Sequence, residues 1–170
     1  MTTLIVNGGR PLSGAFTPTG NKNAALPALA ACLLTDQPVT LHNIPRIKDV
    51  EVMLELLASL GVEVAREGGT VTLRARNVTP VRLDRELCRR VRASILLAGP
   101  LVARAGRAEF YPPGGDVIGR RRLDTHFAGL QALGVSVKAA ETLVFRRRKL
   151  SGAKLLLDQK QGVLGPFDQQ

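Results

Sequence analysis

The sequence predicts a mixed fold of the α/β or α+β class, built from two copies of one helix–strand–helix–strand–strand unit. Residues 60–64 read Leu-Gly-Val-Glu-Val, and residues 133–137 read Leu-Gly-Val-Ser-Val. Asp49 and Asp124 each stand at the start of the helical segment that precedes these stretches. Units repeated at this spacing of roughly 70–75 residues bury their apolar faces only against neighbouring units. We therefore expect two copies to leave helix and sheet faces open.

The first copy follows two short N-terminal strands, expected at residues 4–6 and 12–17. Successive segments of this copy space their apolar residues as a helix or as a strand does, and the copy ends in a hairpin that turns at Gly68-Gly69. Its elements are, in order, a nearly all-apolar helix over 22–34, a strand over 39–43, an amphipathic helix over 49–60 closed by Gly61, and strands over 62–64 and 70–73.

The second copy repeats this order of periods. Its elements are a mostly apolar helix over 92–103, a strand over 108–111, an amphipathic helix over 123–133 closed by Gly134, and strands over 135–137 and 142–145.

Composition and charge restrict the class of protein. The chain has 170 residues, of which 45% are hydrophobic, so it can bury the core of one ordinary domain. The formal net charge of +10 favours anionic partners such as phosphorylated metabolites, nucleic acid or an acidic protein. The absence of Trp and the presence of one Tyr argue against a platform that stacks single-stranded nucleic acid.

Cysteine usage indicates a reducing cytoplasm. Neither Cys32 nor Cys88 has a second Cys or a His at metal-ligand spacing, so we expect no metal site and no disulfide framework. Cys32 is interpreted as a small buried apolar residue. The N-terminus lacks the pattern of a secretory signal peptide, and the Ala/Leu-rich run over 24–34 is too short to span a membrane.

The loop over 112–122 combines two prolines, three glycines, Asp116 and three consecutive arginines. Glycines let the backbone approach a ligand, and guanidinium groups match phosphate and carboxylate. Asp116 sits between Gly115 and Val117, which is not a natural capping position, and partial burial would raise its pKa. We interpret it as a candidate proton donor; an ordinary exposed loop carboxylate is the alternative.

Cations stand at three helix starts: Lys22, Arg92, and the pair Arg120-Arg121 before the helix that carries Asp124. A Lys at a helix N-terminus opposes the helix dipole, so stability alone does not explain it. Free N–H groups and a cation at the same place form a good anion site. The three starts therefore predict one shared anion site.

The acids and histidines near these starts have simpler interpretations. Asp49 and Asp124 are interpreted as helix caps or first-turn acids, although Asp124 could accept a ligand hydroxyl. His126 is interpreted as a structural histidine, and His42 has no identifiable partner.

Five motifs stand in a fixed order along the chain, at 20–27 (GNKNAALP), 43–45 (NIP) with Asp49-Val50, 92–95 (RASI), 99–104 (GPLVAR) and 113–126 (PGGDVIGRR, then Asp124 and His126). Together they resemble the N-terminal part of the UDP-N-acetylglucosamine 1-carboxyvinyltransferase family, the enolpyruvyl transferases of peptidoglycan synthesis. The resemblance extends to about Asp158.

The resemblance implies a reaction and a fold. The family transfers enolpyruvyl from phosphoenolpyruvate to the 3′-hydroxyl of UDP-N-acetylglucosamine and releases phosphate, with no metal or organic cofactor. A cytoplasmic role in cell wall biogenesis, cell shape and the cell cycle follows. The family fold has two inside-out α/β barrel domains of three units each, with the helices inside, so this chain holds an incomplete barrel.

The resemblance also assigns candidate site residues. The positions of Lys22, Arg92 and Arg121 contact phosphoenolpyruvate or the reaction intermediate. Asp116 occupies the loop position that is usually the Cys alkylated by fosfomycin, and we expect it to donate the catalytic proton.

The sugar-nucleotide contacts fall on other positions. In the family, Asn23 contacts the sugar nucleotide. The segment formed by Arg121, Arg122, Leu123 and Asp124 lies along the uridine and diphosphate side.

The chain departs from the family in length and at its end. The family is more than twice as long, and the missing part supplies a carboxylate base and further arginines. We expect residues 1–20 to be strands that in the family belong to the other domain, 21–158 to hold about two units, and 159–170 to be an atypical, replaced tail. Arg122 stands where a Pro is common. A truncated chain of this kind is expected to be weakly active or inactive alone, and to self-associate or to be complemented by a C-terminal half.

Two alternatives stay open. The first is a relative of the shikimate-pathway enolpyruvyl transferase, against which the loop over 115–119 argues. The second is a non-enzymatic remnant that binds anions or nucleic acid, which a steep salt dependence of DNA binding would support.

Overall fold

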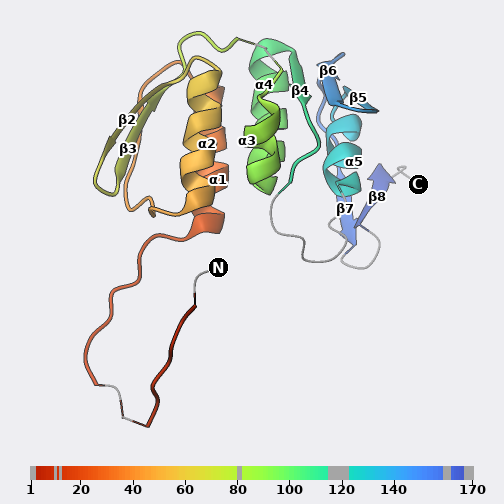
Figure 1. Ribbon diagram of the computed structural model, residues 1–170. Helices are drawn as coiled ribbons and strands as arrows, with labels where there is room; N and C mark the ends of the chain where they lie inside the picture. The colour runs from red at the N-terminus through yellow and green to blue at the C-terminus, as the bar shows by residue number, and fades with distance from the viewer. Residues whose placement is uncertain are drawn as a thin grey trace.

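The described part of the chain contains two three-stranded antiparallel sheets with the same strand order, which lie on either side of the packed helices (Figure 1). The computed structural model describes residues 3–9, 11, 13–79, 82–114, 123–158 and 162–166. In the first sheet, β3 (Thr70–Arg74) lies between β1 (Val39–Leu41) and β2 (Glu63–Glu67). In the second, β6 (Leu143–Arg147) lies between β4 (Arg107–Phe110) and β5 (Val135–Ala139). The predicted mixed fold and its internal repeat are confirmed.

The helices of the two units pack against one another beside these sheets (Figure 1). Unit 1 comprises α1 (Lys22–Ala31), the 3-10 helix η1 (Cys32–Leu34), β1, α2 (Lys48–Ser59), β2 and β3. A short helix, α3 (Arg85–Arg90), follows. Unit 2 comprises the 3-10 helix η2 (Arg92–Leu97), α4 (Ala98–Ala105), β4, α5 (Asp124–Ala132), β5 and β6. A two-stranded sheet of β7 (Leu155–Asp158) and β8 (Gly162–Pro166) completes the described chain, so part of the expected tail is a paired strand.

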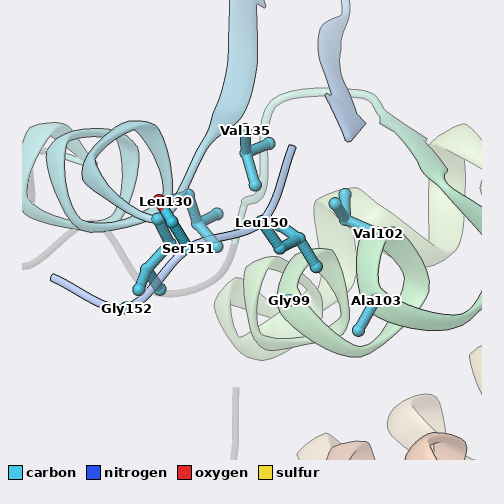
Figure 2. A pocket seen from close by; sticks show the side chains of 9 residues that line it. Gly99, Val102, Ala103, Leu130, Val135, Leu150, Ser151 and Gly152 are labelled. Atoms are coloured by element: carbon cyan, nitrogen blue, oxygen red, sulfur yellow. The ribbon is translucent and has the colours of Figure 1, made fainter. Parts of the chain in front are cut away.

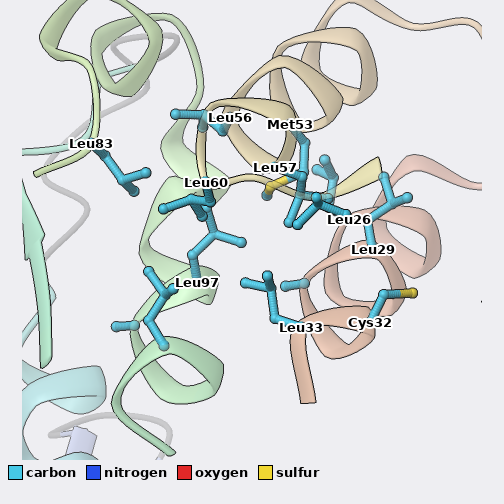
Figure 3. Packing of buried hydrophobic residues seen from close by; sticks show 14 of the residues in the cluster. Leu26, Leu29, Cys32, Leu33, Met53, Leu56, Leu57, Leu60, Leu83 and Leu97 are labelled. Atoms are coloured by element: carbon cyan, nitrogen blue, oxygen red, sulfur yellow. The ribbon is translucent and has the colours of Figure 1, made fainter. Parts of the chain in front are cut away.

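The core lies where the helices of unit 1 meet η2 and α4 of unit 2. Figure 3 shows leucines of α1, η1 and α2 converging on Leu97 of η2. Leu29, Leu57 and Leu97 are completely buried. Full burial of one such side chain contributes about 1.5–3 kcal/mol, so these leucines stabilise the contact between the two units.

Arg104 joins the two units by hydrogen bonds near the C-terminal ends of α4 and η1. The guanidinium group of Arg104, on α4, donates to the backbone carbonyls of Leu33 at 3.0 Å, Thr35 at 2.9 Å and Ala75 at 2.6 Å. A further bond reaches the carbonyl of Arg76 at 3.3 Å. Arg104 therefore satisfies carbonyls that the end of η1 and the end of β3 leave without partners.

The strands expected at 4–6 and 12–17 are not formed by the described residues. Leu4, Ile5 and Val6 are extended and about 85% exposed, and Phe16 is 87% exposed. An extended segment becomes a strand only when a neighbour completes its hydrogen bonds, and none of the described segments lies beside it as a sheet neighbour. The expectation that residues 1–20 are strands belonging to the other domain of the family stays a prediction.

The helix expected over 92–103 is divided. Residues 92–97 form the 3-10 helix η2, and the α-helix α4 begins at Ala98. Pro100 explains the division, because a continuous helix would place its ring in the helix interior, where it removes one hydrogen bond and clashes with the preceding turn. Beginning α4 at Ala98 places Pro100 in the first turn, where no helical N–H bond is needed.

Sequence analysis missed α3. The side chain of Asp84 caps it by accepting a hydrogen bond from the backbone N–H of Leu87 at 2.9 Å. Glu86 lies in its first turn and Arg89-Arg90 in its last, which suits the helix dipole. The cap and this charge order were the available signals.

Candidate functional site

A cavity of about 350 Å³ lies among the helices of both units. Four helical segments contribute to its wall, α1 and α2 from unit 1 and η2 and α5 from unit 2. The lining residues are Lys22, Asn23, Leu26 and Pro27 of α1, Asp49 of α2, Arg92, Ala93, Ile95 and Leu96 of η2, and His126 of α5. The predicted convergence of Lys22 and Arg92 on one place is therefore observed.

The start of α1 holds Lys22 and Asn23 at the cavity through a local cap. The side chain of Asn21 accepts hydrogen bonds from the backbone N–H groups of Asn23 at 2.7 Å and Ala24 at 3.3 Å. Asn21 therefore occupies two of the N–H groups that were expected to be free for an anion. The shared anion site stays a prediction.

Lys22 is paired across the cavity wall. Its Nζ lies 2.8 Å from Oδ2 of Asp49, and the two side chains are 42% and 34% exposed. Asp49 lies in the first turn of α2, as predicted, but its carboxylate is not a helix cap. Sequence analysis missed this contact, which joins residues 27 positions apart in the chain.

Arg92 and His126 are the polar residues that unit 2 contributes to the wall. Arg92 is half-buried at the start of η2. Partial burial of the imidazole lowers the pKa of His126, and the nearby charge of Arg92 lowers it further. Both effects favour the neutral imidazole, which has one N–H donor and one nitrogen acceptor. Sequence analysis did not include it among the site residues.

The cavity combines charge with an apolar floor. Lys22 and Arg92 bring positive charge, Asp49 brings one negative charge, and Leu26, Ile95 and Leu96 contribute apolar surface. Apolar walls keep the local dielectric low, which strengthens the attraction between a cation and a bound anion. The arrangement suits a small ligand that carries phosphate or carboxylate groups and a short carbon chain.

Asp116, Arg121 and Arg122 lie outside the described residues. The ends of their loop are described: Gly114 donates from its N–H to the carbonyl of Cys88 at 3.0 Å, and Leu123 packs against the core. A Cβ atom at position 114 would collide with the backbone of Arg89, so only glycine fits there. Leu123 and Asp124 are at the start of α5, but they are not among the residues that line the cavity.

A second hollow, of about 360 Å³, is almost wholly apolar. Figure 2 shows side chains of α4, α5 and residues 150–152 around it, with Leu150 between Val102 and Leu130. A smaller space of about 260 Å³ shares Gly99 and Leu130 with this hollow and reaches His126. These spaces offer no charged side chain, so they mark an open packing face and not a place for an anion.

No three His, Cys, Asp or Glu side chains are grouped as metal ligands within the described ranges. Over the same ranges, every helix is too short or too polar to cross a membrane.

Comparison with known proteins finds matches in one enzyme family. The family described as EPSP synthase (3-phosphoshikimate 1-carboxyvinyltransferase) matches residues 6–158. A UDP-N-acetylglucosamine 1-carboxyvinyltransferase of Bradyrhizobium diazoefficiens is 54% identical over 156 residues, which are 91% of this chain and 36% of that protein. The protein of the same name from Borreliella burgdorferi is 47% identical over 160 residues, which are 94% of this chain and 38% of that protein. The chain thus spans little more than a third of the length of these relatives.

Solved structures agree on the fold. The enolpyruvyl transferase NikO from Streptomyces tendae is similar with a TM-score of 0.71 and 25% identity, over 85% of this chain and 32% of that one. EPSP synthase from Acinetobacter baumannii is similar with a TM-score of 0.60 and 16% identity, over 82% of this chain and 33% of that one, which shows the fold alone.

Proposed function

The chain belongs to the EPSP synthase family of enolpyruvyl transferases, and we propose that it carries part of the active site of a UDP-N-acetylglucosamine 1-carboxyvinyltransferase. The reaction transfers the enolpyruvyl group of phosphoenolpyruvate to the 3′-hydroxyl of the sugar and releases inorganic phosphate. The names of the relatives at 47–54% identity support this acceptor. The proposed setting is the cytoplasmic synthesis of peptidoglycan for cell wall biogenesis.

The observation that carries the proposal is the convergence of Lys22 and Arg92 on one cavity from matching places in two repeat units. Phosphoenolpyruvate carries a phosphate and a carboxylate, and the two cations that line the cavity can hold one group each. The apolar residues of the same cavity suit its methylene carbon. Asn23, which lines the same cavity, is assigned to the sugar nucleotide.

The chemistry needs an acid and a tight hold on the leaving phosphate. We assign the acid to Asp116, which would protonate the methylene carbon. The sugar hydroxyl would attack the resulting cationic carbon and give its proton to a base. Loss of one methyl proton as phosphate leaves would restore the double bond. Positive charge on Lys22, Arg92 and Arg121 would stabilise the phosphate as it departs. Arg121, Arg122, Leu123 and Asp124 are assigned to the uridine and diphosphate side of the acceptor.

The isolated chain is expected to turn over poorly. Two features favour association: the exposed apolar segment at Leu4–Val6 and the open apolar hollow between α4 and α5. Self-association, or binding of a chain that supplies the rest of a full-length relative, would cover them.

The test is phosphate release by the chain from UDP-N-acetylglucosamine with phosphoenolpyruvate, beside calorimetric titration of each substrate and an Asp116→Ala control. Release that depends on both substrates and on Asp116 supports the whole proposal, and saturable binding without turnover supports the site. Preferential binding of shikimate 3-phosphate would reassign the acceptor. Failure to bind either substrate at millimolar concentration would refute the proposal.

A further inference from the structure

Two acids in the first turn of α2 have different partners. Oδ2 of Asp49 accepts a hydrogen bond from Nζ of Lys22 at 2.8 Å, and Oε1 of Glu51 accepts one from Arg66 at 2.6 Å. Asp49 lines the cavity, whereas Glu51 does not. The helix dipole favours an acid at either position equally. It therefore does not explain why one of them faces the cation of the candidate site.

The contact restricts a side chain that is otherwise flexible. Lys22 has a four-carbon stem and is 42% exposed, so without a partner its ammonium group would sample many positions. Fixing such a side chain on binding costs about 0.5–1.5 kcal/mol. A partner that fixes it beforehand removes that cost from the binding step.

The repeat places the same residue types in the second unit. Lys22 begins α1 and Asp49 lies in the first turn of α2; Arg92 begins η2 and Asp124 is the first residue of α5. Each unit thus combines a cation at the start of its first helix with an acid at the start of its second. Of these two acids, Asp49 lines the cavity and Asp124 does not.

We propose that Asp49 is a positioning residue that holds the Lys22 ammonium group toward the anionic substrate. The inference rests on the proposed function, because it adds a residue to the same cavity. Asp49 acts through Lys22 and needs no contact with the substrate. The orienting action comes from the hydrogen bond, so an amide oxygen at the same place should largely preserve it.

The experiment compares Asp49→Ala, Asp49→Asn and Glu51→Gln for binding of phosphoenolpyruvate to the whole chain by calorimetry. Glu51→Gln is the matched control, because it removes an acid and an ion pair from the same helical turn without touching the cavity. We expect Asp49→Ala to weaken binding about fivefold, which is within the range set by one immobilised side chain. The affinity of Asp49→Asn for phosphoenolpyruvate should stay within about twofold of the parent. This variant keeps an oxygen that accepts the hydrogen bond from Lys22 and removes only a negative charge, which repels the anionic substrate. Tighter or unchanged binding in both Asp49 variants would overturn the proposal, because it would make Asp49 only a counter-charge.

A second readout needs no substrate. The ammonium signal of Lys22 in a proton–nitrogen NMR spectrum is identified as the one missing from Lys22→Met. It should persist in Glu51→Gln and Asp49→Asn and broaden or vanish in Asp49→Ala. If phosphoenolpyruvate does not bind, the proposed function fails while this spectrum still decides whether Asp49 orders Lys22. An unchanged signal in Asp49→Ala would refute that ordering.

Discussion

The two repeat units share one sheet order but bury their second helices to very different extents. α2 of unit 1 has six buried residues, and α5 of unit 2 has none. α2 packs against α1, α3 and η2, whereas α5 packs mainly against strands β5 and β8 and borders the apolar hollow. The same helix–strand pattern therefore yields a core helix or a surface helix according to its neighbours, which a pattern of residues within one unit does not encode.

The largest expected effect tests this contrast directly. Leu57→Ala in α2 removes a completely buried side chain, and Leu130→Ala in α5 removes one that lines the hollow. We expect Leu57→Ala to lower the free energy of unfolding by about 2–5 kcal/mol, and Leu130→Ala by about 1 kcal/mol or less. Urea denaturation measures both. Equal losses would mean that α5 is as well packed as α2.

A second comparison concerns the cations that the two units supply. Lys22→Met and Arg92→Met should each weaken phosphoenolpyruvate binding about 10- to 100-fold, the range for loss of a charged hydrogen bond. Lys138→Met, which removes an exposed charge from β5, is the control. An equal loss in Lys138→Met would reduce the result to overall charge and would argue against a shared site.

The glycines that follow α2 and α5 should show the opposite order of effects, with the larger loss of stability in unit 2. Gly61 and Gly134 have φ angles of +87° and +91°, so alanine is strained at either place. A Cβ at position 134 would also collide with the carbonyl oxygen of Lys149, whereas at position 61 it would lie 3.0 Å from that of Asn77. We expect losses of about 2 kcal/mol for Gly134→Ala and about 1 kcal/mol for Gly61→Ala by thermal unfolding. A smaller loss at position 134 would show that the segment around Lys149 yields easily.

The contribution of the outer faces of the two sheets to stability should depend differently on acidic pH. Thr40 on β1 bonds Thr72 at 3.0 Å, while Glu109, at the matching place on β4, bonds Arg82 and Arg107 at 2.6 Å each. Burial alone would raise the pKa of Glu109, but the hydrogen bonds from Arg107 and Arg82 outweigh it and lower that pKa.

A lowered pKa in the folded state means that ionised Glu109 adds stability above its unfolded pKa and loses it as the pH falls further. Glu109→Gln should therefore lower Tm at pH 7, and the difference from the parent should shrink below about pH 4. Thr40→Val, which has no group that titrates there, should show a difference that does not depend on pH. A constant difference for Glu109→Gln as well would refute the assignment.

Local patterns were sufficient for the elements that local chemistry decides. The spacing of Val52, Leu56 and Leu60 predicted α2, and the glycine pair at 68–69 predicted the hairpin of β2 and β3. The N-terminal strands stay a prediction, because a strand depends on a partner that its own residues do not specify. η2 was misjudged because the effect of Pro100 was not applied to the helix that contains it.

The site was partly predictable for the same reason. The repeat identified Lys22 and Arg92 as equivalent, and the structure brings them to one cavity. The pairing of Lys22 with Asp49 depends on how α1 packs against α2, and the position of His126 depends on how α5 approaches η2. Neither arrangement is visible in residue spacing, although the shared position of Asp49 and Asp124 was a usable signal.

The bonds of Arg104 bear on how the molecule comes apart. Its guanidinium group lies on α4, but its acceptors are the backbone carbonyls of unit 1. If unit 1 unfolded alone, that group would lose its hydrogen-bond acceptors, and the shared leucine core would be exposed. Unfolding of one unit alone therefore costs almost as much free energy as unfolding of both. Amide protons in α1 and α4 should therefore exchange with solvent at similar rates and through the same opening event. Two units that look like separate copies along the chain would then behave as one cooperative block.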